Sequence, residues 1–176
     1  MRFAPTAIDG VVVIDLDLQN DERGFFARSF CEAEFADAGL VATYSQANVS
    51  YNARRGTLRG LHYQASPAEE AKVVRCTAGA AFDVAVDLRI GSPTFRSWVG
   101  YELSAANRRA LYVPVGCAHG FETLADDTEL TYLMSVAYEP SLARGIRWND
   151  PALDITWPIA DPIVSQRDET FPSLDR

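Results

Sequence analysis

Histidine and cysteine are scarce in this sequence of 176 residues. The two histidines, His62 and His119, lie in apolar or glycine-containing segments, which makes them the first candidates for chemistry. Cys31, Cys76 and Cys117 are widely spaced and form no CxxC pair. Neither a disulfide framework nor a thiolate zinc site is indicated, and we expect all three cysteines to be buried packing residues.

Positively charged residues are also few, and long apolar segments are absent from the sequence. The 16 Lys and Arg residues against 24 Asp and Glu give a net charge of −8, which argues against nucleic acid or an anionic membrane as a partner. No apolar stretch reaches the roughly 18 residues of a membrane helix, and the first residues lack a signal-peptide pattern, so we expect a cytoplasmic protein. The length predicts one domain over residues 1–176, and the 48% apolar fraction suits a globular core.

Short segments with period-two alternation dominate the sequence. Over residues 82–88, apolar residues alternate with Asp83, Ala85 and Asp87, which predicts a strand whose aspartate face is exposed to solvent. Residues 11–18 alternate in the same way. Further short strands are expected at 44–51, 57–63, 72–77, 97–103, 110–114 and 128–137. Many short strands in one domain predict an all-β sandwich or barrel.

One segment is helical in pattern. Ser29 and Glu32 have the spacing of a capping box, and Gly39 follows the expected last turn. Because helical patterns are otherwise rare, a parallel βαβ architecture is disfavoured. We expect an antiparallel jelly roll of two sheets with one or a few short peripheral helices, whose interior can hold a ligand.

Three residues, Pro114, Gly116 and His119, have a P-x-G-x-x-H spacing that resembles a motif of cupins, the metal-binding jelly rolls. The companion cupin motif needs an H-x-H pair and a Glu, whereas this chain offers His62 alone, with Lys72 nearby. Divalent metals bind neutral imidazole, carboxylate or thiolate, and an ammonium group repels them. The pattern predicts a cupin-like pocket without a metal.

A pocket with His, Lys and Tyr suits proton transfer beside a carbonyl. Imidazole has an ordinary pKa of about 6.5 and is a workable base at neutral pH. The resulting enolate needs a positive neighbour for its oxygen, a part that Lys72 can take. Inversion also requires a proton donor on the opposite face of the carbon, and Tyr132 suits that part.

Five longer stretches carry a resemblance to a known family: DERGFFARSF, QANVSYNARRGTLRGLHYQ, AKVVRCTAGAAFDVAVDLRIGSPTFRSWVGYELS, NRRALYVPVGCAHGF and ARGIRWNDPALDITWP. Together with the residues between them they resemble the dTDP-4-dehydrorhamnose 3,5-epimerase family over roughly residues 5–170. The resemblance implies a homodimeric cupin-type jelly roll that needs no metal or cofactor. It also implies a substrate in which a nucleoside diphosphate carries a 4-keto-6-deoxy sugar.

The resemblance also implies roles for individual residues. His62 matches the catalytic base and Asp168 its carboxylate partner, Lys72 matches the lysine that polarises the C4 ketone, and Tyr132 matches the general acid. Arg59 matches an arginine that binds the diphosphate, for which the guanidinium fork is well suited. The full set of implied substrate-binding residues is Arg23, Arg28, Gln46, Asn48, Arg59, His119 and Tyr138.

Departures from the family pattern leave the substrate open. Arg28 stands where a carboxylate usually follows the GFF run, and Gln19 stands where an aromatic residue is usual. The loop between Asn48 and Gly56 is one residue longer than usual and carries two arginines, Arg54 and Arg55. Another nucleotide base or another 4-keto sugar is therefore an open alternative.

Strict alternation raises a geometric question at the first histidine. It places Arg59 and His62 on opposite faces of their strand, so a bulge at Gly60 is needed to turn both inward. Ordinary structural roles remain alternatives for three other residues: Lys72 as a surface lysine, Tyr132 as a packing residue and Asp168 as an exposed aspartate.

Several functions remain open beside a 3,5-epimerase. A C3-only epimerase or a 3,4-ketoisomerase would use similar proton transfers, and the sequence does not decide whether C3, C5 or both are inverted. A non-catalytic sugar-nucleotide-binding cupin and a metal-dependent cupin dioxygenase are the alternatives from other classes.

Overall fold

The computed structural model describes residues 1–174. Strands account for most of the regular structure, and two short helices, α1 (Glu32–Asp37) and α2 (Gln166–Glu169), lie near the two ends of the chain. The strands are β1 (Arg2–Pro5), β2 (Val12–Asp15), β3 (Gln19–Asp21), β4 (Gly24–Phe26), β5 (Gln46–Asn52), β6 (Thr57–Gln64), β7 (Lys72–Ala78), β8 (Ala80–Asp87), β9 (Trp98–Ser104), β10 (Ala110–Val113), β11 (Cys117–Thr123), β12 (Thr128–Met134), β13 (Ala143–Gly145) and β14 (Ile163–Val164).

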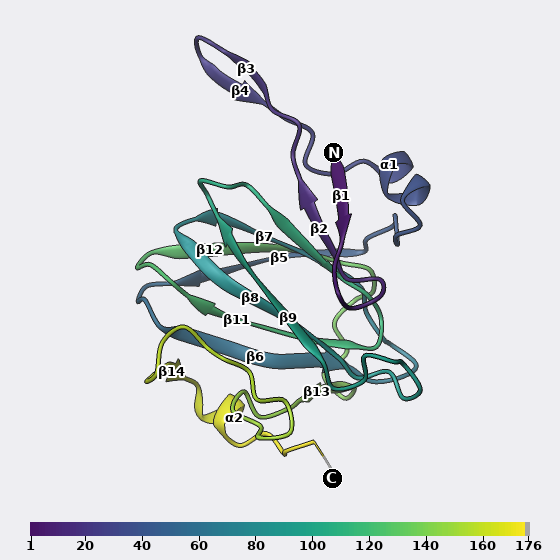
Figure 1. The fold of residues 1–176 in the computed structure, drawn as a ribbon, viewed down its shortest axis with the longest axis vertical. Helices are drawn as coiled ribbons and strands as arrows, with labels where there is room; N and C mark the ends of the chain where they lie inside the picture. The colour runs from purple at the N-terminus through teal and green to yellow at the C-terminus, as the bar shows by residue number, and fades with distance from the viewer. Residues whose placement is uncertain (175–176) are drawn as a thin grey trace.

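Two large sheets face each other and form the body of the molecule (Figure 1). The first sheet has the order β1-β2-β10-β7-β12-β5, and the second has the order β13-β6-β11-β8-β9. All neighbours on these paths are antiparallel, while β14 adds to β6 in parallel. The expected jelly roll of two antiparallel sheets with short peripheral helices is confirmed. A two-stranded hairpin of β3 and β4 stands apart from this body, at the top of Figure 1.

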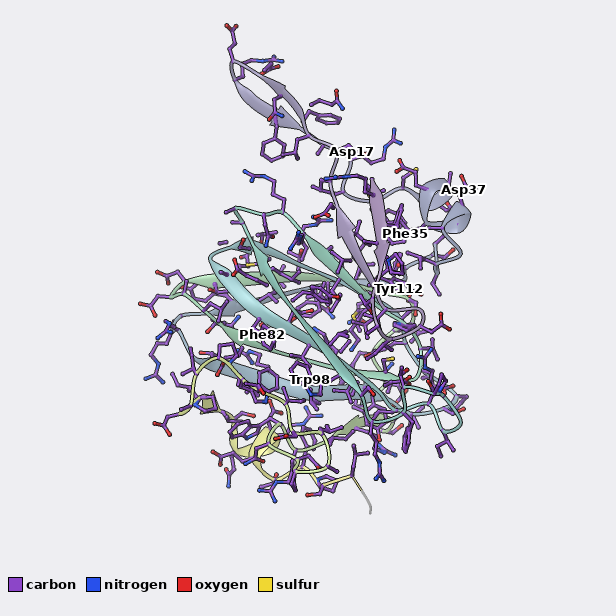
Figure 2. The ribbon with its side chains drawn as sticks, viewed as in Figure 1. Asp17, Phe35, Asp37, Phe82, Trp98 and Tyr112 are labelled. Atoms are coloured by element: carbon purple, nitrogen blue, oxygen red, sulfur yellow. The ribbon has the colours of Figure 1, made fainter. Side chains whose placement is uncertain are left out.

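The aspartate face of β8 is buried, which corrects the expectation from its alternation. Asp83 and Asp87 are fully inaccessible to solvent. Asp83 shares its face with Ala85, which belongs to the core between the sheets. The opposite face carries Phe82 and Val84 and packs under the C-terminal segment, which includes Trp157. Both faces of this central strand are therefore covered, and the aspartates point to the inside. Figure 2 shows Phe82 beside Trp98 of β9.

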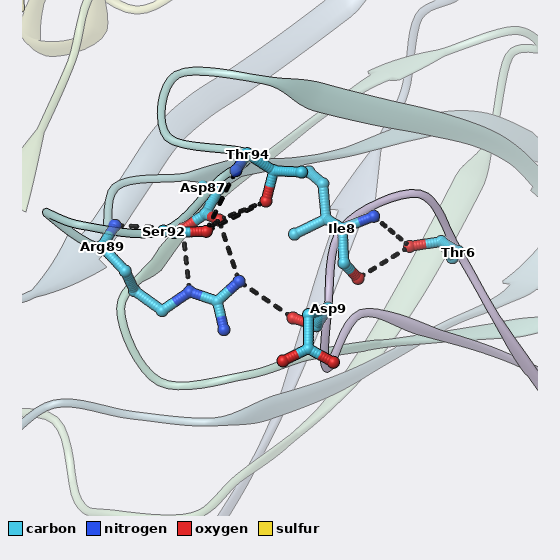
Figure 3. A network of polar contacts seen from close by, with 7 residues as sticks. All are labelled: Thr6, Ile8, Asp9, Asp87, Arg89, Ser92 and Thr94. Carbon is cyan, nitrogen blue, oxygen red and sulfur yellow. Dashed lines mark hydrogen bonds and ion pairs between the residues drawn. The ribbon is translucent and has the colours of Figure 1, made fainter.

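Asp87 closes one end of the body through a polar network (Figure 3). Its carboxylate accepts hydrogen bonds from the Arg89 guanidinium and from the hydroxyls of Ser92 and Thr94, at 2.6–2.9 Å. Burial by itself raises the pKa of Asp87, but these four donors lower it well below its usual range. Arg89 also donates to the carbonyl of Asp9 at 2.9 Å, which ties the turn after β8 to the β1–β2 loop.

Helix α1 lies close to the expected position but starts differently. Its N-cap is Cys31, which makes no side-chain capping bond, so the expected capping box at Ser29 is wrong. The C-terminal expectation is confirmed: Gly39 has φ +72°, and Leu40 N donates to Phe35 O in a Schellman turn. Phe35 is buried against the outer face of the first sheet, as Figure 2 shows, and anchors the helix there.

Two of the cysteines, Cys76 and Cys117, are buried as expected, whereas Cys31 is partly exposed. Burial raises the pKa of the Cys76 thiol to about 11 and that of Cys117 to about 12, so both stay protonated at neutral pH. Within residues 1–174, no helix is both long enough and apolar enough to span a bilayer.

Candidate active site

A cavity of about 260 Å³ opens between the two sheets and holds both histidines. His62 on β6 and His119 on β11 are direct cross-strand partners, so their side chains lie next to each other on the inner face of the second sheet. The residues that line the cavity are Gln46, Asn48, Val49, Ser50, Arg59, His62, Gln64, Glu70, Lys72, His119, Phe121, Tyr132, Met134 and Tyr138. A larger hollow of about 430 Å³ on the outer face of the first sheet is lined by no histidine and no carboxylate, so it offers no general base.

Lys72 and Tyr132 face the histidines from the opposite sheet. Lys72 opens β7 and pairs with Met134 of β12, while Tyr132 pairs with Val74 of β7. Residues 132 and 134 project to the same side of their strand, and so do residues 72 and 74. Lys72 and Tyr132 are therefore diagonal neighbours on the inner face of the first sheet. The imidazoles approach a bound molecule from one side of the cavity, and the ammonium and phenol approach it from the other.

Asp168 reaches His62 from a segment far along the chain. Strand β14 pairs in parallel with the start of β6 and brings helix α2 beside His62. Asp168 Oδ1 lies 2.9 Å from His62 Nε2, and Oδ2 accepts a hydrogen bond from Gly60 N at 3.2 Å. Ser165 caps α2 by accepting from Asp168 N at 3.1 Å. The carboxylate is thus held on both oxygens.

The charge state of Asp168 follows from these contacts. Burial raises its pKa, but the bonds to His62 and to Gly60 N lower it below its usual value of 3.8. The group is therefore a carboxylate at neutral pH and can only accept hydrogen bonds. An acceptor-only carboxylate requires Nε2 of His62 to donate, so in the neutral form of the ring the free lone pair is on Nδ1. That is the form of imidazole that can act as a base.

The ring of His62 is also held by packing. Phe171 contacts it edge-on, with ring centroids 5.6 Å apart. Gly145 leaves room for this contact, because a Cβ at that position would lie 2.3 Å from the Phe171 ring. His62 nevertheless remains open to the cavity, with a side chain that is 40% exposed.

A bulge at Gly60 turns both Arg59 and His62 toward the cavity, as the alternation required. The register between β6 and β11 shifts between the His62–His119 and Arg59–Phe121 pairs. Gly60 has φ +136°, and a Cβ there would lie 2.6 Å from the Cα of Gly120, so only glycine fits. Arg59 Nε donates to Asn52 Oδ1 at 2.8 Å, which fixes the guanidinium at the rim.

His119 forms a second histidine–aspartate pair, deeper in the molecule. Its Nε2 lies 2.8 Å from Asp83 Oδ1, and the two side chains are 5% and 0% exposed. The Tyr132 ring stands edge-on to His119 at 5.9 Å. Burial and the charge of Asp83 raise the pKa of Tyr132 well above its usual value, against smaller opposing effects of Arg59 and Ser50. Tyr132 is therefore a neutral phenol that can donate a proton.

Two acidic residues of this site were missed from the sequence. Asp83 was assigned to a solvent face, although the alternation of β8 already placed it on the same face as Ala85. Glu70 forms an ion pair with Lys72, with Oε1 2.7 Å from Nζ. It lies two residues before Lys72, the spacing that brings side chains to one side of an extended chain, and this was the available signal.

The implied substrate-binding residues fall into two groups. Gln46, Asn48 and Tyr138 join Arg59 and His119 around the cavity, where Gln46 Nε2 donates to Asn48 Oδ1 at 2.9 Å and Gln46 Oε1 accepts from Tyr138 N at 2.9 Å. Arg23 and Arg28 lie elsewhere: Arg23 pairs with Asp21 in the β3–β4 hairpin, and Arg28 pairs with Glu34 of α1 at 2.6 Å. The fold of this chain does not bring these two arginines to the cavity.

Within the described 174 residues, no group of three or more His, Cys, Asp or Glu side chains is arranged to hold a metal ion. The donors at the cavity instead form separate pairs, each histidine with its own carboxylate.

Comparisons with known proteins agree with this geometry. The sequence model of the family described as dTDP-4-dehydrorhamnose 3,5-epimerase matches residues 5–176. This chain belongs to that family. A dTDP-4-dehydrorhamnose 3,5-epimerase of Shigella flexneri is 44% identical over 169 residues, which cover 96% of this chain and 93% of the relative. Membership in the dTDP-4-dehydrorhamnose 3,5-epimerase family makes the protein a carbohydrate epimerase.

Two further relatives are informative about the ligand and about the number of carbons that are inverted. The crystal structure of a dTDP-4-dehydrorhamnose 3,5-epimerase from Bacillus anthracis with TDP and PPi bound matches with a TM-score of 0.95, at 41% identity, over 98% of this chain and 99% of that one. A dTDP-4-dehydrorhamnose 3-epimerase of Streptomyces niveus is 42% identical over 170 residues, which cover 96% of this chain and 82% of the relative. The family therefore includes enzymes named for one inversion as well as for two.

Proposed function

We propose that this chain epimerises a dTDP-linked 4-keto-6-deoxy sugar at C3 and C5, with His62 as base and Tyr132 as acid. One observation carries the proposal: these two groups face a single cavity from opposite sheets, with the lysine on the acid's side. A sugar ring lying between the sheets would meet the base on one face and the acid on the other. Opposed proton transfers of this kind invert a carbon centre.

The reaction begins with His62. Nδ1, left without a hydrogen because Asp168 holds Nε2, removes the proton from the carbon beside the C4 ketone. Asp168 fixes the ring and stabilises the imidazolium that forms. The electron pair of the broken C–H bond moves onto the ketone oxygen and gives an enolate.

Lys72 and Tyr132 complete the inversion. The Lys72 ammonium donates to the C4 oxygen and stabilises the negative charge as it develops. Tyr132 then delivers its phenolic proton to the opposite face of the same carbon, and the ketone re-forms. The imidazolium and the phenolate return to their starting forms by exchange with solvent. C3 and C5 both flank the ketone, so one set of groups serves both positions when the ring presents each in turn.

The remaining cavity residues suit the nucleotide end of the substrate. Arg59, fixed at the rim by Asn52, offers a charged fork for diphosphate oxygens. Gln46 and Asn48 add amide groups, and Tyr138, half exposed at the mouth, adds an aromatic face. His119 lies behind the sugar position. This arrangement supports a sugar nucleotide as the substrate rather than a free sugar.

Arg23 and Arg28 contribute through a second copy of the chain in this proposal. The β3–β4 hairpin stands away from the body (Figure 1) and exposes Phe25 and Phe26, whose exposed fractions are 43% and 76%. A hairpin that exposes two aromatic side chains suits pairing with a second copy, in a cytoplasmic homodimer. The whole chain, residues 1–176, acts as one domain in this proposal. Sedimentation at micromolar concentration tests this: a dimer is expected, and a monomer would contradict it.

The experiment for the function follows solvent deuterium into a dTDP-4-keto-6-deoxy sugar. We expect exchange at both C3 and C5, each with inversion, and faster exchange than in a sample without enzyme. Exchange at C3 alone would support the second candidate, a C3-only epimerase, which the Streptomyces niveus relative favours. Tight dTDP binding with exchange at neither carbon would contradict the proposal and indicate a binding module.

A further inference from the structure

Lys72 is the only lysine in the chain, although the chain has many arginines. Its side chain is 5% exposed, and that of Glu70, its ion-pair partner, is 7% exposed. Both line the cavity with His62 and Tyr132. Since Oε1 and Nζ are 2.7 Å apart, the lysine reaches the substrate position already bound to a carboxylate.

The backbone between the two residues is clamped. Ala71 N donates to Ser135 Oγ at 2.8 Å, and Ser135 N donates to Ala71 O at 2.9 Å, which fixes the start of β7 against the end of β12. Gln64 Nε2 donates to Ala68 O at 2.9 Å and secures the turn that leads into Glu70. The direction in which Glu70 holds the ammonium is thus set by the fold.

A buried ammonium needs such a partner. Removing one member of a buried ion pair leaves an uncompensated charge, which is strongly unfavourable. Without the carboxylate the ammonium turns toward water, and its positive charge moves away from the place where the enolate oxygen develops.

We propose that Glu70 is a positioning residue that holds the Lys72 ammonium aimed at the C4 oxygen, an inference that rests on the proposed role of Lys72. Glu70 acts through Lys72 and does not touch the reacting atoms. Its effect belongs to the chemical step, because enolate stabilisation is required only after the substrate has bound.

The kinetic test compares Glu70→Gln with Glu69→Gln. The first keeps the shape of the side chain and removes its charge, while the second makes the same charge change at the exposed neighbouring residue. We expect Glu70→Gln to lower kcat for deuterium exchange about 10- to 100-fold, as expected for a displaced catalytic group. KM and dTDP affinity should stay within about twofold, and Glu69→Gln should match the wild type. Equal losses in both variants, or an unchanged kcat in Glu70→Gln, would overturn the proposal.

A second measurement does not depend on activity. Protein labelled with ¹⁵N-lysine has a single side-chain Nζ signal, because Lys72 is the only lysine. A paired, buried ammonium exchanges its hydrogens slowly, so we expect a sharp ammonium signal in the wild type. Exchange with water should become at least about tenfold faster in Glu70→Gln, since the ion pair that protects these hydrogens is gone. A rapidly exchanging wild-type ammonium, or no change in the variant, would contradict the proposal.

The two measurements separate this inference from the proposed function. If the wild type exchanges no deuterium into the sugar, the function fails, and the NMR signal still decides whether Glu70 holds Lys72. If Glu70→Gln does not fold, Glu70→Asp replaces it: that variant keeps the charge but shortens the side chain by one methylene. It should lose part of kcat, and full wild-type kcat together with unchanged NMR exchange would overturn the inference.

Discussion

The molecule contains two histidine–aspartate pairs side by side, and their surroundings differ. His62–Asp168 opens to the cavity, with an imidazole that is 40% exposed, whereas His119–Asp83 is buried, with an imidazole that is 5% exposed. The bond lengths are nearly the same, at 2.9 and 2.8 Å. The geometry of the pairs therefore does not identify the catalytic base. The exposure of the imidazole identifies it, because a catalytic base must reach the substrate and must release the proton to water.

The carboxylates of the two pairs also have different origins. Asp83 lies on β8, directly beside the strand of His119, so the sheet itself fixes that pair. Asp168 lies on the short helix α2, 106 residues from His62, and depends on the parallel contact of β14 with β6. One pair is part of the core, while the other is assembled at the edge of the sheet. We therefore expect changes in His62–Asp168 to affect mainly activity, and changes in His119–Asp83 to affect mainly stability.

The largest effect that tests this division is expected in the exposed pair. His62→Asn should lower the rate of deuterium exchange about 10³-fold, because it removes the base. His119→Asn should cost only about tenfold, the equivalent of roughly one lost hydrogen bond. Rates at saturating substrate, with dTDP affinity as the control for folding, give the comparison. Equal losses in the two variants would show that exposure does not distinguish the pairs.

A somewhat smaller kinetic loss is expected from Asp168→Asn. The amide can donate to Nε2, which leaves the hydrogen on Nδ1 and blocks the base, so we expect a loss of about 10²-fold or more in kcat. An unchanged affinity for dTDP serves as the control for folding. Retention of full activity would mean that the carboxylate does not set the form of His62.

For stability, we expect the larger effect in the buried pair. Asp83→Ala leaves the His119 ring without its partner in a place that water does not reach, and we expect it to lower the free energy of unfolding by about 1–3 kcal/mol. Asp168→Ala should cost less, because His62 can bond to water in the open cavity. Urea unfolding of both variants tests this. A larger loss for Asp168→Ala would place the structural role in the exposed pair.

The smallest expected effect is a change of stability with pH. The pKa of Asp168 is lowered in the folded protein, so its carboxylate stabilises the fold above the usual value of 3.8. That contribution is lost as the pH falls through the folded pKa. Urea unfolding of the wild type and Asp168→Asn should therefore differ at neutral pH and converge in acid. Asp87, whose pKa is also lowered, is present in both proteins, so its contribution to the pH dependence is the same in each and cancels in the difference. A gap that widens in acid would contradict the assigned sign.

Much of the fold was predictable from local pattern. The strands expected at 57–63 and 72–77 appear as β6 and β7 within one residue at each end, because alternation and flanking turn residues are local signals. The hairpin of β3 and β4 was not foreseen, because its strands are only three residues long and every residue in them is exposed, so no buried face gives an alternating pattern. The burial of Asp83 was also misjudged. Alternation defines two faces, but only packing decides which face meets the second sheet and which meets the C-terminal segment.

By itself, the sequence determined the fold class, the family and the residue types available for proton transfer, since periodicity and motif spacing act over a few residues. The family resemblance implied that Asp168 is the partner of His62, and the tertiary structure showed how α2 and β14 bring the two together. Only the tertiary structure decided that Asp83 turns inward and meets His119. It also placed Arg23 and Arg28 outside the cavity. Such placements depend on strand register, on the bulge at Gly60 and on the packing of the C-terminal segment against one sheet. These are contacts between residues far apart in the chain, so they produce no local pattern in the sequence.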